Sequence, residues 1–252
     1  MKTCAYCNVA NVKFTREHVW PDNIIEKCES LLTYNPKHEN FYKGDPIVKD
    51  VCGSCNNNHL SKIDDYLASL FDKYFASYIE SGQSAKFSYD YNFLLRGLLK
   101  ISYNSARTTD NEKQRKLLAK FARQVLHGGA FTSVMVRLQI VTKSKAVTLM
   151  GNELGVLRPD VLRCGVVAYD GRLGNRFCIR LVGFRSYWFY VIIPYKIEPK
   201  HIWMELVSNL ERWVTPMGVL VNPIENNLTI PVDKTTWFTP TLLGNLARDF
   251  KS

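Results

Sequence analysis

The apolar positions of this chain change their spacing near Gly129. Before that point they recur every three or four residues, which is typical of amphipathic helices. Helices are predicted over three stretches: one from the Asn56–Leu60 region to about Ile79, one over Tyr91–Ser102 and one over Asn111–Leu126. Gly82 and the Gly128-Gly129 pair suit the ends of the first and third helices.

After Gly129 the spacing moves towards two, in segments rich in Val, Ile, Phe and Tyr. Strands are predicted at Phe131–Val141, Ala146–Met150, Gly165–Tyr169, Phe177–Phe184 and Tyr187–Ile193, with hairpin turns at Asp170-Gly171 and Gly183–Ser186. A helix over Lys200–Trp213, short strands near Val219–Val221 and Leu228–Pro231, and a terminal helix near Pro240–Phe250 follow. Residues 1–58 are turn-rich and irregular. The pattern predicts an α+β fold whose sheet is antiparallel.

The net charge of +10 is unevenly spread along the 252 residues. Residues 1–80 hold nine of the 33 Lys and Arg and eleven of the 23 Asp and Glu, a net of −2, so the remainder carries +12. This asymmetry favours a polyanionic partner for the second part of the chain. An excess of basic residues on a solvated surface is the alternative.

The seven cysteines favour a metal site over a disulfide framework, because four of them fall in two Cys-x-x-Cys pairs.

No apolar run reaches the roughly 20 residues needed to span a bilayer, and the chain begins without an apolar signal region. A cytoplasmic protein with no membrane partner is therefore expected.

The two pairs are Cys4/Cys7 and Cys52/Cys55. Two thiolates separated by two residues can hold one metal in a tight turn, and four complete the tetrahedral sphere of zinc. The sequence therefore predicts one structural Zn²⁺ bound by these four cysteines.

A carboxylate, an imidazole and an amide lie within this cysteine frame. Glu17 and His18 are adjacent, and Asn56 follows Cys55 directly. Along an extended segment neighbouring side chains point to opposite sides, so Glu17 could hold a cation while His18 addresses water. Histidine suits a general base near neutral pH, and carboxylate and amide oxygens suit Mg²⁺. Asn56 is placed to begin a helix and close such a site.

The combination Cys-x-x-Cys, Glu-His-x-x-Pro and Cys-x-x-Cys-Asn-Asn resembles the HNH, or ββα-metal, endonucleases. The resemblance covers about the first 80 residues and implies a zinc-stapled, treble-clef-like module. It implies that His18 is the general base, that Glu17 and Asn56 bind a catalytic Mg²⁺ or Mn²⁺, and that cleavage leaves a 5′-phosphate. The middle Asn of the motif has no clear counterpart, although Asn40 is a candidate. His59 is a further candidate ligand or phosphate contact, with a surface histidine as the alternative.

We therefore expect a nuclease module over residues 1–80 and a basic α+β domain over residues 81–252. In the latter, helices are expected at about 90–127, mainly strands at about 130–232, and a C-terminal helix. This domain would bind the substrate DNA, a protein partner or a second copy of the chain. Candidate nucleic-acid contacts are Arg16, Lys116, Lys120, Arg123, Arg172, Arg176 and Arg180. Strands with apolar residues inward and arginines outward would give the same pattern.

The function expected from the resemblance is metal-dependent hydrolysis of DNA, in restriction or phage defence. Two alternatives remain open: a non-catalytic zinc-dependent nucleic-acid-binding protein, and an HNH nuclease that acts on RNA.

Overall fold

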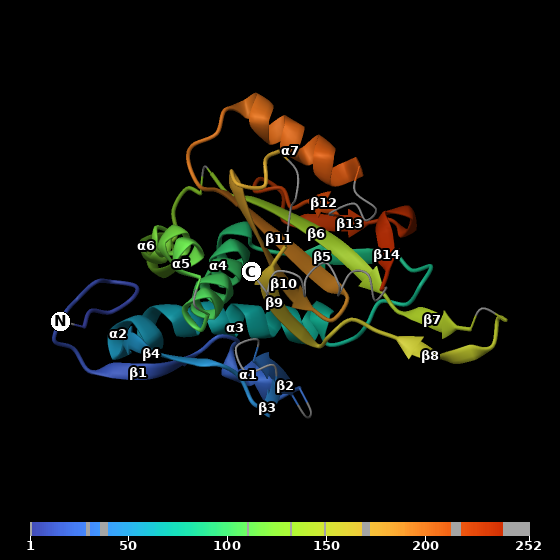
Figure 1. The fold of residues 1–252 in the computed structure, drawn as a ribbon. Coiled ribbons are helices and arrows are strands. Elements are labelled where there is room, and N and C mark those ends of the chain that lie inside the picture. Colours follow the sequence, from blue (N-terminus) through green and yellow to red (C-terminus); the bar gives the residue numbers. More distant parts are fainter. Residues whose placement is uncertain are drawn as a thin grey trace. The chain divides into compact units, whose positions relative to one another are not determined.

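A computed structural model describes residues 2–28, 31–35, 40–109, 111–131, 133–148, 150–167, 172–212 and 218–238. The chain divides into two compact units (Figure 1). Unit 1 comprises Met1–Lys73 and Asn92–Thr132, and unit 2 comprises Tyr74–Tyr91 and Ser133–Ser252. Unit 1 thus combines the cysteine-rich segment with helices from the middle of the sequence. The predicted assignment of roles to residues 1–80 and 81–252 stays a prediction.

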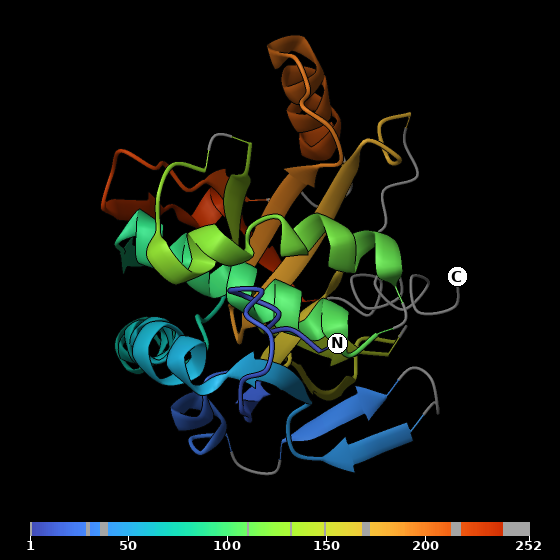
Figure 2. The same cartoon turned by 90° about the vertical axis from the view of Figure 1, so that its left-hand side faces the viewer.

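Unit 1 begins with two antiparallel strands, β1 (Phe14–His18) and β4 (Ile47–Cys52). A short helix, α1 (Asp22–Ile25), and a β-hairpin lie between them in the sequence. The hairpin strands are β2 (Leu32–Asn35) and β3 (Asn40–Lys43), and they extend from unit 1 as a two-stranded arm (Figure 2). The region predicted to be irregular therefore contains a strand pair, of which β1 carries Glu17 and His18.

A nearly continuous helical segment follows β4 directly. It consists of α2 (Gly53–Cys55), a π-helical turn η1 (Asn56–Leu60), α3 (Ser61–Leu70) and a second π-helical turn η2 (Phe71–Phe75). Leu60, Ile63 and Leu67 are fully buried, as the three- and four-residue spacing predicts. π-Helical turns inside α-helices are frequent at functional sites, and η1 contains Asn56.

The remaining helices of unit 1 are α4 (Tyr91–Arg107), α5 (Glu112–Ala119) and α6 (Ala122–His127). Most residues of α4 between Leu94 and Ala106 are buried on all sides, which is the pattern of a central core helix. Gly97 of α4 faces Leu67 of α3 so closely that a Cβ atom on Gly97 would lie 2.8 Å from the Leu67 side chain. The missing side chain of Gly97 therefore allows α3 to pack directly on α4.

Unit 2 is built on a six-stranded sheet. Its strands run in the order β12 (Val219–Leu220), β6 (Met135–Thr142), β11 (Tyr187–Pro194), β10 (Phe177–Phe184) and β9 (Leu162–Val166), all antiparallel. The sixth strand, β14 (Thr235–Trp237), pairs with β6 in parallel. Strands β10 and β11 join through Arg185-Ser186, with Arg185 in the left-handed region at a φ of 49°.

Apolar residues cover both faces of this sheet. Helix α7 (Lys200–Arg212) packs on one face through Ile202, Leu206 and Leu210. On the other face the ring of Phe75 stacks on Phe184, with centroids 4.9 Å apart. Smaller elements complete the unit: β5 (Ala85–Ser88) pairs with β13 (Asn227–Ile230), β7 (Ser144–Val147) pairs with β8 (Glu153–Leu157), and η3 (Val232–Lys234) precedes β14.

The antiparallel sheet and its combination with helices confirm the predicted mixture of the two. The single helix predicted over Asn111–Leu126 is wrong, because the chain turns at Lys120-Phe121 and buries Phe121 between α5 and α6. The first helix ends at Phe75 and does not reach Ile79. Beyond it, the Ile79 N–H donates to Ser186 Oγ, 2.9 Å away, within unit 2.

Other differences concern the ends of elements. Helix α4 continues five residues beyond the predicted end, and β8 has no counterpart among the predicted strands. The Asp170-Gly171 turn and the Pro240–Phe250 helix lie outside the described residues. In the described part of the chain, no helix combines the length and apolarity that crossing a bilayer requires.

We expect Gly97→Ala to lower the free energy of unfolding by about 1–3 kcal/mol, because the new methyl group overlaps Leu67 in a packed core. Urea unfolding measures this cost. In the Leu67→Ala background the same substitution should cost much less, since the overlapping atoms are gone. An equal cost in both backgrounds would contradict direct packing of Gly97 on Leu67.

Candidate functional site

The four predicted zinc ligands come together in unit 1. The sulfur atoms of Cys4, Cys7, Cys52 and Cys55 all lie within 4.8 Å of one another, and three of the four residues are buried. Sulfurs placed about 2.3 Å from a tetrahedral zinc are about 3.8 Å apart, and Cys7 Sγ lies 3.8 Å from Cys52 Sγ. The donor set and its spacing fit a structural zinc ion. Among the described residues no other group of three or more Cys, His, Asp or Glu has such spacing.

Backbone N–H groups favour the thiolate form of Cys4, whereas burial raises the pKa of the Cys7 and Cys55 thiols. Burial alone would raise the pKa of the Cys4 thiol, but N–H groups of Cys7, Cys52 and Tyr6 point at its sulfur and lower the pKa to about 7. The Cys52 N–H donates to Cys4 Sγ at 3.4 Å. Hydrogen bonds of this kind hold a ligand in place and stabilise its metal-binding form.

A β-bulge lies beside the candidate catalytic residues. Thr15 pairs with Val51 and Glu17 pairs with Val48, so the register of β1 and β4 shifts between Thr15 and Glu17. Bulges bend a strand and change the direction of its side chains. Beyond the bulge, Glu17 is buried, whereas the His18 side chain keeps 30% of its surface exposed. The two neighbours therefore point into different environments, as an extended segment predicts.

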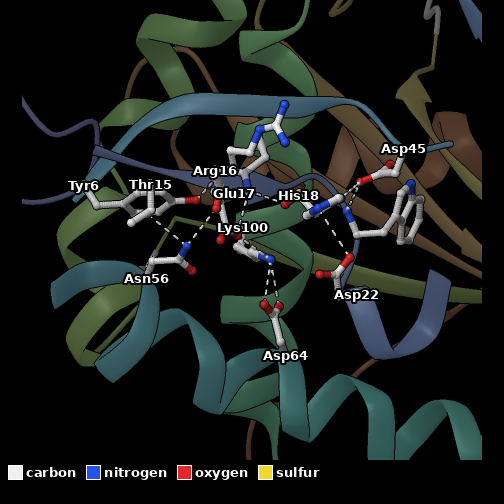
Figure 3. A network of polar contacts seen from close by, with 12 residues as sticks. Tyr6, Thr15, Arg16, Glu17, His18, Asp22, Asp45, Asn56, Asp64 and Lys100 are labelled. Carbon is white, nitrogen blue, oxygen red and sulfur yellow. Dashed lines mark hydrogen bonds and ion pairs between the residues drawn. The ribbon is translucent and has the colours of Figure 1, made fainter. Parts of the chain in front are cut away.

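Glu17 is held by residues of α4 (Figure 3). Its Oε1 atom lies 2.7 Å from the Lys100 ammonium and accepts a hydrogen bond from Asn104 Nδ2 at 3.2 Å. Lys100 also donates to both carboxylate oxygens of Asp64 on α3, at 2.8 and 3.0 Å. Burial lowers the pKa of Lys100, but the two carboxylates raise it more, so this ammonium stays charged. Burial also raises the pKa of Asp64, to about 6.

His18 lies between two aspartates. Its Nδ1 atom is 3.6 Å from Asp45 Oδ2, and its Nε2 atom is 3.4 Å from Asp22 Oδ1. Asp45 is almost fully buried and accepts a hydrogen bond from the Trp20 N–H at 3.1 Å, whereas Asp22 is exposed. Burial raises the pKa of Asp45 to about 7. His18 Nδ1 and Asp45 Oδ2 are thus close to each other without a hydrogen bond between them, and Nε2 lies on the side of the exposed Asp22.

Asn56 connects the helical segment to β1. Its Nδ2 atom donates to Thr15 Oγ1 at 3.1 Å and to the Arg16 carbonyl at 2.9 Å. The amide oxygen of Asn56 is therefore the atom that could bind a cation. His59 has a different environment, because its ring lies edge to face against His127 of α6, with centroids 5.0 Å apart. The roles of Asn56 and His59 in metal binding stay predictions.

The same network reaches the cysteine cluster. Tyr6, between Cys4 and Cys7, donates its hydroxyl hydrogen to Asn104 Oδ1 at 2.7 Å. The Arg107 guanidinium lies over the Tyr6 and Tyr103 rings and donates to Asp50 Oδ1 at 3.0 Å and to Asn104 Oδ1 at 2.7 Å. Asn104 thus contacts the segment between two metal ligands and the carboxylate of Glu17 at once.

The predicted nucleic-acid contacts differ in exposure. Arg16, Lys116, Lys120 and Arg123 are exposed, and Lys116 forms an ion pair with Glu112 at 2.8 Å. Arg172 pairs with Glu205 at 2.5 Å, and Arg176 pairs with Glu198. Arg180 is 2% exposed and donates to Cys164 Sγ. A surface contact to phosphate is therefore available to the first four residues, to Arg172 and to Arg176, but not to Arg180 in this conformation.

Four residues of the site escaped the sequence reasoning: Asp45, Asp64, Lys100 and Asn104. Lys100, Asn104 and Arg107 recur at i, i+4 and i+7, so they share one face of α4. That spacing was the available signal. Asp45 lies between Gly44 and Pro46, and only the fold brings it to His18. The backbone of Asn40 belongs to β3, which pairs with β2 and forms a sheet separate from the β1–β4 pair. The side chain of Asn40 is outside the described residues.

Comparisons of the chain with protein-family models, with curated proteins and with solved structures gave no match. The residues and geometry of unit 1 are therefore the basis for a proposed function.

We expect purified protein to carry one zinc ion per chain, and Cys55→Ser to lose it. Because the cysteine cluster replaces an apolar core for a short segment, the variant should also lose cooperative unfolding of unit 1. Elemental analysis and circular dichroism measure the two effects. The matched control is Cys28→Ser, which removes a buried cysteine of the same unit outside the cluster. Equal zinc loss in both variants would refute the assignment of the ligands.

Stability should depend on pH through Asp45. The pKa of Asp45 rises from 3.8 to about 7 on folding, so the folded protein binds a proton that the unfolded chain has already released. Stability therefore falls as the pH rises from about 4 to about 7. Asp45→Asn cannot titrate, so its free energy of unfolding relative to wild type should rise across this window. Urea unfolding at several pH values measures the slope, with exposed Asp72→Asn as the control. A pH-independent difference for Asp45→Asn would refute the prediction.

Proposed function

We propose that the protein is a metal-dependent HNH-type endonuclease that hydrolyses phosphodiester bonds of DNA. The observation that carries this proposal is the order of elements around the site. Strand β1 bears both Glu17 and His18 and pairs with β4, and the helical segment that follows β4 carries Asn56 near its start, whose amide donates back to β1. This is the ββα order that the sequence motif implies, and the cysteine cluster staples it.

His18 is proposed to remove a proton from the attacking water. Asp45 contacts the Nδ1 side of the ring and would hold the imidazole in place, so that Nε2 accepts the proton. Asp22, on the Nε2 side, is exposed and would give way to water and the phosphate. Once Asp45 has lost its proton, above a pKa of about 7, it would also stabilise the positive charge that develops on the ring.

A divalent cation would supply positive charge to the developing phosphorane and to the leaving oxygen. Glu17 and Asn56 offer the carboxylate and amide oxygens that Mg²⁺ and Mn²⁺ prefer, and Asn56 is anchored beside Glu17 through the Arg16 carbonyl. Both contacts to Glu17 fall on Oε1, so Oε2 would face the cation. The donor chemistry therefore fits, with Lys100 as a competing cation.

Charge supports a nucleic acid as the substrate. The excess of +12 on residues 81–252 favours a polyanion. The exposed Lys116, Lys120 and Arg123, on α5, α6 and the turn between them, belong to the same unit as the site. We propose that unit 1 contacts the cleaved strand and that unit 2 binds more DNA, a protein partner or a second copy. A role in restriction or phage defence inside the cell is proposed from the family resemblance alone.

One observation favours a second candidate, a zinc-dependent nucleic-acid-binding protein without catalysis. The carboxylate of Glu17 is already neutralised by the Lys100 ammonium at 2.7 Å, which weakens its attraction for a divalent cation. Catalysis and binding are therefore measured separately in the decisive experiment.

We expect wild-type protein to nick or cut plasmid DNA with Mg²⁺ or Mn²⁺, and EDTA to stop the reaction. His18→Ala should reduce the rate on the order of 10²–10⁴-fold and leave zinc content and DNA affinity nearly unchanged, because the base acts only in the chemical step. His201→Ala, an exposed histidine of α7, is the matched control and should cleave like wild type.

Glu17→Ala and Asn56→Ala should require more metal, and excess Mn²⁺ should restore part of their activity. Cleavage of RNA in place of DNA would select the RNA-directed alternative. Binding without cleavage by wild type would select the non-catalytic alternative, and full activity of His18→Ala would refute the general base.

A further inference from the structure

The Lys100 side chain is unusual because its ammonium is removed from water and lies between two carboxylates. Lys100 has no exposed surface, and its Nζ atom lies 2.7 Å from Glu17 Oε1 and 2.8 Å from Asp64 Oδ1 (Figure 3). It comes from α4, outside the segment that resembles the HNH module. Complete burial means that this ammonium cannot touch a nucleic acid, so it acts only through the groups around it.

The two carboxylates hold the ammonium unequally. Asp64 accepts from Lys100 through both oxygens, at 2.8 and 3.0 Å, whereas the shortest contact of Glu17 to the ammonium is at Oε1, 2.7 Å away. Oε1 of Glu17 also accepts from Asn104 Nδ2. The ammonium therefore keeps a two-oxygen partner if Glu17 turns towards another cation.

The positive charge of Lys100 should lower the affinity of Glu17 for a divalent cation. One ammonium between two carboxylates leaves a net charge of −1 on the cluster. A divalent cation on Glu17 would meet the ammonium at short range, and like charges a few ångströms apart in a protein repel strongly. The cation must therefore compete with Lys100 for the same carboxylate.

We propose that Lys100 is a positioning residue that competes with the divalent cation for Glu17, and that Asp64 sets the outcome by holding the ammonium when Glu17 binds the metal. This inference rests on the proposed function, since it assumes that Glu17 is a metal ligand. Lys100 keeps Glu17 oriented without metal and raises the metal concentration that the site requires.

The test measures Mn²⁺ binding to the zinc-loaded full-length chain by calorimetry. Lys100→Met removes the competing charge with little change in length, so Mn²⁺ should bind about tenfold more tightly or better. Asp64→Asn leaves the ammonium with Glu17 alone, so Mn²⁺ should bind about tenfold more weakly. A purely structural ion pair would weaken metal binding in both variants or in neither.

The Lys27–Asp72 ion pair provides matched controls in the same unit. Lys27→Met and Asp72→Asn should leave the affinity for Mn²⁺ unchanged. If Lys100→Met fails to fold by thermal unfolding and zinc content, the double variant Lys100→Met/Asp64→Asn replaces it, because this variant leaves Glu17 as the one charged group of the three. It should bind Mn²⁺ more tightly than Asp64→Asn.

Opposite shifts for Lys100→Met and Asp64→Asn support the inference. Shifts in the same direction, no shift in folded variants, or equal affinity of the double variant and Asp64→Asn overturn it. Plasmid cleavage by wild type reports separately on the proposed function. A wild type that cleaves while Lys100→Met binds Mn²⁺ like wild type refutes only the inference. A wild type that does not cleave, with Lys100→Met gaining affinity, refutes only the nuclease.

Discussion

Placing an ammonium away from water costs several kcal/mol unless negative charge and hydrogen bonds surround it. Unit 1 satisfies that requirement with Glu17 from β1 and Asp64 from α3. The ion pairs of Lys100, which lies on α4, therefore join β1, α3 and α4. Removing either carboxylate changes the balance of a cluster that has no access to solvent at its centre. The geometry around Glu17 is therefore a consequence of how the core is neutralised as much as of any metal.

The cysteine cluster and the ion cluster constrain the same short stretch of chain from two sides. The first fixes Cys4, Cys7 and the β4–α2 junction, and the second fixes the end of β1. Asn104 joins them through Tyr6 on one side and Glu17 on the other. Hydrogen bonds in a buried network reinforce one another. A change in the position of the cysteines should therefore alter the hydrogen bond to Glu17 through Tyr6 and Asn104, without direct contact between the cysteines and Glu17.

The sequence could predict those parts of the molecule whose cause is local. Periodicity predicted the bounds of Phe177–Phe184 and the start of α7, because apolar spacing there reflects burial directly. The spacing of the cysteines predicted their cluster, because four thiolates around one metal ion would require that spacing. The end of α4 was missed because Asn104 and Arg107 are polar residues in a buried position. Their partners include Glu17, which is 87 residues from Asn104 in the chain, and no local pattern encodes that contact.

The Asp45 contact to His18 was missed for the same reason, since it depends on how the segment between β3 and β4 returns to β1. The contacts of helix α4 also determine where the module ends in the sequence, because unit 1 includes Asn92–Thr132. A boundary drawn after the last recognisable motif residue would cut off Lys100, Asn104 and Arg107, and would leave Glu17 and Asp64 facing each other with no counter-charge. A fragment of residues 1–80 is thus expected to be an incomplete folding unit. Any transfer of this module to another protein, by recombination or by design, must carry α4 with it.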